Sequence, residues 1–217
     1  MKKAAVIYFS KHGSAKTYAE WVAEDIGADL FNGADIRMED LKPYDVLVFG
    51  GGIYSGGIQG REFIQKGMKK AFAHKLVFVF GVGITVEDEK NREQADQINF
   101  QKRMRTIPSW YFPGAYNPSE IKGFDKKIMG VTRKMIGEGD AGEFADRLRD
   151  YIDHGCDLKD RSAIAPMTEE ILRVMEDDTI TVQAHIAPDE RVQEDRKTDS
   201  LFRRFFGKGN KDWQKWE

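Results

Sequence analysis

Short apolar runs alternate with amphipathic stretches along this chain. The continuous runs cover residues 4–9, 46–49, 76–80 and 110–112, and a weaker run covers residues 30–31. Each of the longer runs is rich in β-branched or aromatic residues and is apolar at every position. Runs of this kind are typical of strands that are buried on both faces, as in a parallel sheet. We therefore expect a parallel sheet, with residues 30–31 at its edge.

The segments between these runs have the periodicity of helices. Apolar residues recur at steps of three and four through residues 15–26, 63–72 and 144–152, and Gly27 is a plausible C-terminal cap for the first segment. The charged stretch 87–105 predicts a largely solvated helix. Strands that alternate with helices favour right-handed βαβ units in a doubly wound α/β sheet. Such sheets bind ligands beyond the carboxyl ends of their strands, so the loops after residues 9, 49, 80 and 112 become the candidate site.

Composition narrows the class of protein. The chain has 217 residues, of which 41% are hydrophobic and 32% charged, with a formal net charge of -2. These values suit one good-sized globular domain and give no basic excess for binding nucleic acid. A single cysteine, Cys156, excludes an intramolecular disulfide. No segment is apolar for long enough to form a signal peptide or a membrane span, so we expect a cytoplasmic protein.

The loop after the first run has the composition of an anion-binding turn. Residues 10–17 carry hydroxyls, a glycine and exposed backbone amides at the start of a helix, where free N–H groups and the helix dipole attract an anion. The loop lacks the spacing of a dinucleotide fingerprint or a Walker loop, which favours a mononucleotide phosphate. The alternative is an ordinary turn with Ser14 as N-cap. The candidate phosphate ligands are Ser10, Lys11, His12, Gly13, Ser14 and Ala15.

Two glycine-rich loops follow later strands and suit a flat ligand. Residues 50–57 include Tyr54, whose aromatic face can stack on a planar ring while the glycines allow close backbone approach. Residues 81–85 supply a second, smaller loop. The alternative is a flexible loop with Tyr54 packed on the surface. The candidate ring contacts are Gly51, Gly52, Ile53, Tyr54, Ser55, Gly56, Gly81, Val82 and Gly83.

These two loops resemble those of one family. Residues 10–15 resemble the FMN phosphate loop of flavodoxins, T/S-x-T-G-x-T, with His12 and Ala15 standing where that loop usually has hydroxyl residues. Residues 50–56 resemble the G-x-x-I-Y-x-G loop of the wider flavodoxin-like group. The resemblance covers about residues 1–155. It implies FMN as cofactor and a flavodoxin-like five-stranded parallel sheet of order 2-1-3-4-5 with helices on both faces.

A second resemblance concerns the additions to a minimal domain. We expect an FMN-binding domain over residues 1–155 with a basic helical insertion at 117–139, and a C-terminal extension over 156–217 that is partly helical or disordered. The insertion is similar to a basic segment of the bacterial FMN-dependent protoporphyrinogen oxidase group. A basic amphipathic segment suits porphyrin carboxylates or a membrane surface that supplies quinone, with residues 119–136 or 201–213 making peripheral membrane contact.

Three functions remain open on the sequence alone. The first is an FMN-dependent oxidoreductase, protoporphyrinogen oxidase-like or quinone-linked, whose partner is a redox protein or a small-molecule substrate. The second is a flavodoxin-type electron carrier without its own substrate, and the third is a flavin-free interaction module on the same scaffold. No side chain is identified as a catalytic acid or base. No metal site is expected, because the histidines lack partners at ligand spacing.

Overall fold

The computed structural model describes residues 1–139, 142–181, 183 and 186. The predicted contact at residues 201–213 lies outside this part of the chain. The strands are β1 (Ala4–Phe9), β2 (Asp29–Asn32), β3 (Val46–Tyr54), β4 (Gly57–Ile58), β5 (Leu76–Gly83), β6 (Ser109–Pro113), β7 (Ala115–Tyr116) and β8 (Cys156–Asp157). The α-helices are α1 (Ser14–Ile26), α2 (Arg61–Gly67), α3 (Glu89–Asn99), α4 (Gly123–Gly139), α5 (Glu143–His154) and α6 (Ala165–Glu176).

The main sheet is parallel and confirms the predicted strand order. Its strands pair in the order β2-β1-β3-β5-β6, which is 2-1-3-4-5 when these five are counted along the chain. Two short antiparallel additions lie outside that order. β4 folds back on the end of β3, and β7 pairs with β8 after the chain has passed through α4 and α5.

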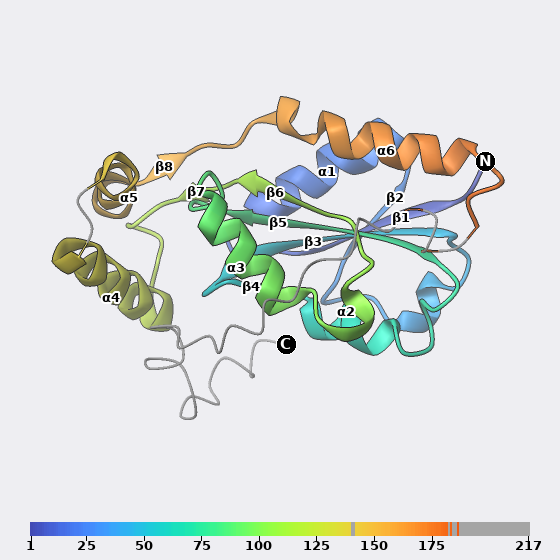
Figure 1. Ribbon diagram of the computed structural model, residues 1–217, viewed down its shortest axis with the longest axis horizontal. Coiled ribbons are helices and arrows are strands. Elements are labelled where there is room, and N and C mark those ends of the chain that lie inside the picture. The colour runs from blue at the N-terminus through green and yellow to red at the C-terminus, as the bar shows by residue number, and fades with distance from the viewer. Residues whose placement is uncertain (140–141, 182, 184–185, 187–217) are drawn as a thin grey trace.

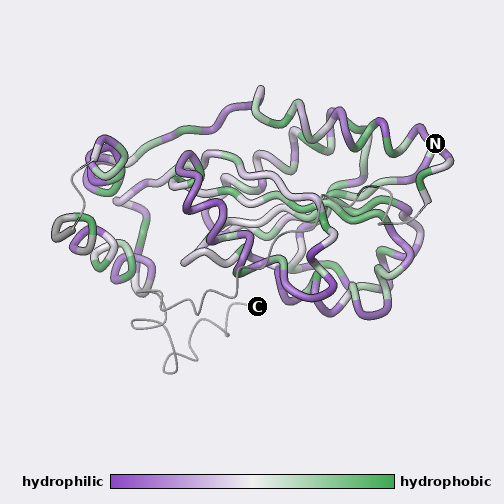
Figure 2. Tube along the Cα trace, viewed as in Figure 1, coloured by the Kyte–Doolittle hydropathy of each residue, from purple (hydrophilic) through white to green (hydrophobic). Residues whose placement is uncertain are grey.

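Helices cover both faces of the sheet, as Figure 1 shows. Successive residues of β1 alternate between two cores: Val6 packs with α1 and α6, and Ile7 packs with α2 and the segment that follows α3. Figure 2 shows the resulting concentration of hydrophobic residues along the central strands. α4 and α5 lie apart from both layers, at the end of the sheet where β7 and β8 are found (Figure 1).

Two of the predicted loops are in fact strand. β3 continues through Gly51 and Gly52 to Tyr54, and β5 continues to Gly83, so the glycines extend the sheet. The reason is steric. A Cβ at Gly50 would collide with the ring of Phe80, and one at Gly51 would collide with the backbone of Gln59. These glycines are required because the neighbouring chain approaches the sheet closely there.

The domain also extends beyond its predicted boundary at residue 155. Met167, Ile171 and Val174 of α6 are completely buried in the core that contains α1. The Tyr18 hydroxyl of α1 donates to Pro113 O at 2.8 Å and accepts from the Asp160 amide at 2.9 Å, which fixes the return of the chain from α5. The segment through α6, which was predicted as part of a partly helical C-terminal extension, therefore packs in the same core as α1.

Replacing Ile171 by Ala tests whether α6 belongs to the folded domain. Because Ile171 is fully buried, the cavity left behind is expected to lower the free energy of unfolding by about 2–5 kcal/mol. Urea denaturation followed by circular dichroism measures this change. Glu169→Ala, on the exposed side of the same helix, should change stability little. Equal stability of both variants would show that α6 contributes nothing to the fold.

Candidate functional site

A cavity of about 150 Å³ lies where the carboxyl ends of β1, β3 and β5 meet. The phosphate loop forms one wall, the end of β3 forms a second, and α4 covers both. Its lining residues are Ser10, Lys11, His12, Ser14, Ala15, Gly52, Ile53, Tyr54, Ser55, Val82, Gly83, Ile84, Gly114, Ala115, Tyr116, Ile121, Asp125, Ile128 and Met129. Segments far apart in sequence thus surround one space.

The phosphate loop presents several hydrogen-bond donors to this cavity. Gly13, at φ 92°, precedes α1, and no side chain caps the first turn of that helix, so its leading amides remain available. Ser10 Oγ accepts from the Gly13 amide and Ser14 Oγ accepts from the Ala115 amide, both at 3.1 Å. Each serine can still donate its own hydroxyl proton. The alternative assignment of Ser14 as N-cap is wrong, because Gly13 is the cap and Ser14 begins the helix.

The turn after β3 is held in a specific conformation. Ser55 and Gly56 have φ values of 52° and 78°, and the turn returns as β4. Asn99, which is 1% exposed, secures it: Asn99 Oδ1 accepts from the Ile58 amide at 2.8 Å and Nδ2 donates to Gly56 O at 2.7 Å. An α3 side chain therefore positions the turn that carries Tyr54.

Tyr54 lies between the turn and the phosphate loop. Its ring centroid is 6.0 Å from that of His12, so the two predicted loops are in contact. A Cβ at Gly52 would lie 3.0 Å from the Tyr54 ring, so a larger residue there would crowd the ring. Burial raises the pKa of Tyr54, and the nearby Asp125 carboxylate raises it further, so the hydroxyl stays protonated at neutral pH. Tyr54 is thus a neutral aromatic wall.

α4 closes the cavity with residues that sequence reasoning did not assign to the site. The Asp125 carboxylate lies 2.8 Å from Lys11 Nζ and 3.1 Å from His12 Nε2, and its side chain is only 12% exposed. Ile128 and Met129, one turn further along α4, line the same space. The only sequence signal was an acidic residue within a basic insertion, and a charge pattern does not tell which loop the helix contacts.

Most of the predicted site residues line the cavity, and four do not. Gly13, Gly51, Gly56 and Gly81 contribute by backbone shape: Gly13 and Gly56 adopt positive φ, and Gly51 and Gly81 are buried in the sheet. Their predicted contact with a cofactor stays a prediction. The lining residues absent from the predicted set, besides those of α4, are Ile84, Gly114, Ala115, Tyr116 and Ile121.

The residues that line the cavity suit FMN chemically, but the cavity volume is smaller than that of usual ligand pockets. Hydroxyls, free amides, Lys11 and His12 at one end suit a phosphate, and Ile53, Tyr54 and Tyr116 at the other suit a planar ring. Ligand pockets usually enclose about 300–1,000 Å³, which exceeds the present volume. Asp125 adds a negative charge among the phosphate donors. The residues therefore fit FMN, and α4 lies closer to them than a bound flavin allows.

Comparison with known proteins agrees with this geometry. A family model of the flavodoxin domain matches residues 5–143, which span the phosphate loop, the Tyr54 turn and α4. This chain belongs to the flavodoxin domain family. The match confirms the predicted flavodoxin-like family and supports FMN as the cofactor. No curated protein matches the sequence.

Solved structures of flavodoxins and flavoproteins are similar to this chain. A flavodoxin from the domain Archaea is 17% identical over 70% of this chain and 99% of its own, with a TM-score of 0.34. A Lactobacillus acidophilus flavoprotein in complex with FMN is 16% identical over 52% of this chain and 93% of its own, with a TM-score of 0.38. Flavodoxin 2 from Bacillus cereus is 14% identical over 70% of this chain and 95% of its own, with a TM-score of 0.37.

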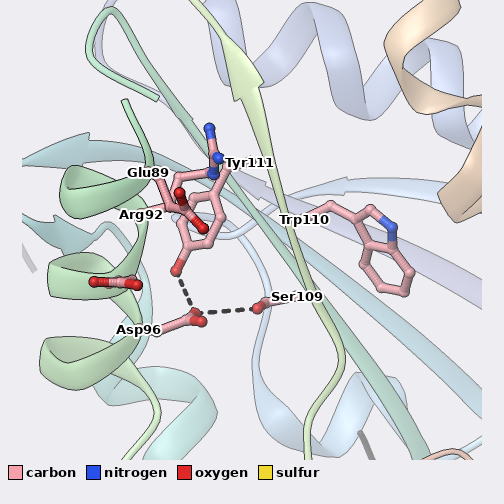
Figure 3. A pocket seen from close by; sticks show the side chains of 7 residues that line it. Glu89, Arg92, Asp96, Ser109, Trp110 and Tyr111 are labelled. Carbon is pink, nitrogen blue, oxygen red and sulfur yellow. Dashed lines mark hydrogen bonds between the residues drawn. The ribbon is translucent and has the colours of Figure 1, made fainter. Parts of the chain in front are cut away.

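A larger hollow of about 360 Å³ on this flavodoxin domain lies between α3 and the edge strand β6. Figure 3 shows Glu89, Arg92 and Asp96 of α3 on one side of β6 and Trp110 directed to the other. Asp96 accepts from the Tyr111 hydroxyl at 2.6 Å and from Ser109 Oγ at 3.2 Å. Since this hollow is mainly acidic and contains none of the predicted loops, it is not the candidate cofactor site.

Among residues 1–139 and 142–181, no helix combines the length and hydrophobicity that a bilayer span requires.

Replacing Asn99 by Ala tests how the Tyr54 turn is held. The buried Ile58 amide and Gly56 carbonyl would lose their partner, which should lower the free energy of unfolding by about 1–3 kcal/mol. Hydrogen exchange of residues 54–58 should also become faster, because the turn is released from α3. Gln97→Ala, exposed on the same helix, is the control. Unchanged exchange in Asn99→Ala would contradict a positioning role.

Proposed function

We propose that this flavodoxin-domain protein binds FMN in the cavity beneath α4 and acts as an FMN-dependent oxidoreductase. One observation carries the proposal: the two predicted loops border the same cavity. His12 of the phosphate loop lies beside Tyr54 of the turn after β3. One end of this cavity suits an anion and the other suits an aromatic ring. Together the two ends indicate a phosphorylated planar ligand more specifically than one loop does by itself.

Each wall has a distinct role in this proposal. The Ser10 and Ser14 hydroxyls and the first amides of α1 hold the phosphate, with charge from Lys11 and His12. Tyr54 and the backbone of residues 82–83, which line the same cavity, would hold the ring. When bound, FMN supplies hydride and electron transfer, while the protein contributes position and electrostatics.

The substrate class follows from α4. Ile128 and Met129 offer an apolar surface at the cavity, and Lys122, Lys126 and Lys127 are exposed around the start of the helix. An apolar ring system with carboxylates, such as a porphyrinogen, or a quinone at an anionic membrane surface, suits that combination. We propose such a substrate for this site, in line with the resemblance of residues 117–139 to the protoporphyrinogen oxidase group.

The second candidate is an electron carrier without its own substrate. The titratable side chains among the described lining residues favour this candidate. Asp125 is paired with Lys11 and His12, and burial raises the pKa values of Tyr54 and Tyr116, so none of these three groups is available as an acid or base. A carrier needs only electron transfer and no such group.

Replacing Ser10 by Ala tests the phosphate end. The loss of one hydroxyl donor to a charged phosphate should weaken FMN binding roughly tenfold, whereas binding of riboflavin, which has no phosphate, should be unchanged. Quenching of flavin fluorescence measures both dissociation constants. Ser162→Ala, a serine on the exposed surface, is the control. Equal weakening of FMN and riboflavin would contradict the assignment of Ser10 to the phosphate.

Steady-state turnover separates the two candidate functions. An oxidoreductase reconstituted with FMN should transfer electrons from protoporphyrinogen, as donor, to a quinone, as acceptor, over many cycles. Rapid electron exchange with a flavodoxin reductase and no turnover with either small molecule would instead favour the carrier. Absorbance of product over time is the measurement, and protein without FMN is the control.

A further inference from the structure

The phosphate loop already contacts an anion that belongs to the chain itself. Asp125 of α4 places its carboxylate within ion-pair distance of Lys11 and His12, at 2.8 Å and 3.1 Å. These are the two basic side chains that the proposed function assigns to the flavin phosphate. The Asp125 side chain is 12% exposed, so solvent and salt screen this contact less than they screen a surface ion pair.

We propose that Asp125 is an internal competitor for the phosphate subsite, and that FMN binds by displacing its carboxylate from Lys11 and His12. This inference rests on the proposed function and concerns its selectivity. The phosphate and the Asp125 carboxylate are like charges that would share the same donors, and like charges at that distance repel. The loop therefore holds one of the two anions at a time.

The attachment of α4 allows such a displacement. The helix begins at Gly123, whose φ is +58°. A Cβ built at Gly123 would have no neighbouring atom within 4 Å. Further along, Arg133 forms a bidentate contact with Asp153 of α5, with Nη2–Oδ2 at 2.7 Å and Nε–Oδ1 at 2.8 Å. α4 therefore keeps its contact with α5 when Asp125 is released from the loop.

Displacement also accounts for the size of the cavity. Ile128 and Met129 occupy its α4 side, and the enclosed volume of about 150 Å³ is below that of usual ligand pockets. Because Asp125, Ile128 and Met129 are on one helix, moving the carboxylate away from the loop also withdraws the two apolar side chains. One ionic contact thereby controls both the charge and the volume of the site.

Flavin titration of the Asp125→Asn variant tests the inference. The full chain, freed of flavin, is titrated with FMN and with riboflavin, and fluorescence quenching gives the dissociation constants. Removing the competing charge should tighten FMN binding by roughly tenfold and riboflavin binding clearly less, because riboflavin gains only the room that α4 leaves and has no phosphate to gain from the freed donors. Asp150→Asn is the matched control, because it removes the same charge from α5, where Asp150 pairs with His154.

A second measurement needs no flavin. Hydrogen exchange of residues 123–139 should be faster in Asp125→Asn than in wild type, and inorganic phosphate should accelerate exchange in wild type only. Both results are expected if the carboxylate holds α4 on the loop and an external anion replaces it. Exchange that is the same in both proteins, with and without phosphate, would overturn the inference.

The titrations separate this inference from the proposed function. Wild type that binds FMN, together with Asp125→Asn that binds it no tighter, overturns the competitor and leaves FMN binding intact. Equal tightening of FMN and riboflavin also overturns it, because Asp125 would then act only by holding α4 over the ring end. Absence of binding for both flavins in every variant overturns the proposed function, and the competitor with it.

Discussion

Parallel pairing of β1, β3 and β5 is the constraint on which the site depends. The register places Phe9 beside Gly51 and Gly52 beside Val82, so the residues that follow each strand emerge at one edge of the sheet. Ser10, Tyr54 and Ile84 come together for that reason alone, although they are separated along the chain. A slip of one residue would reverse which side chains face each core, and the buried strands tolerate no such change.

The apolar runs predicted the five strands of the main sheet and the loops that border the site. The family resemblance supplied the order of the strands. Prediction failed where tertiary contacts decide. Gly51 and Gly52 looked like a loop because glycine-rich segments usually are, yet they pair with β1 and β5 as strand, and the close approach of Gln59 requires glycine at Gly51. α6 was missed although Ile164, Met167 and Ile171 have helical spacing, because the resemblance ended near residue 155 and the following segment was treated as an extension.

The role of α4 shows a different limit of sequence reasoning. Residues 117–139 were correctly predicted to contain a basic helix, but nothing in their pattern indicates that Asp125 contacts the phosphate loop. That contact is made between residues more than a hundred positions apart. Because of this contact, the insertion also covers the cavity. Its lysines are exposed to solvent, and Ile128 and Met129 line the cavity.

Flavin retention tests the central claim most directly. The purified full chain is incubated with excess FMN and desalted, and its visible spectrum is recorded. Our account predicts a flavin absorbance band between violet and blue, at one FMN per chain, that remains with the protein. A protein that stays colourless after this treatment would show that the loops at this edge of the sheet do not hold FMN, and would contradict the account.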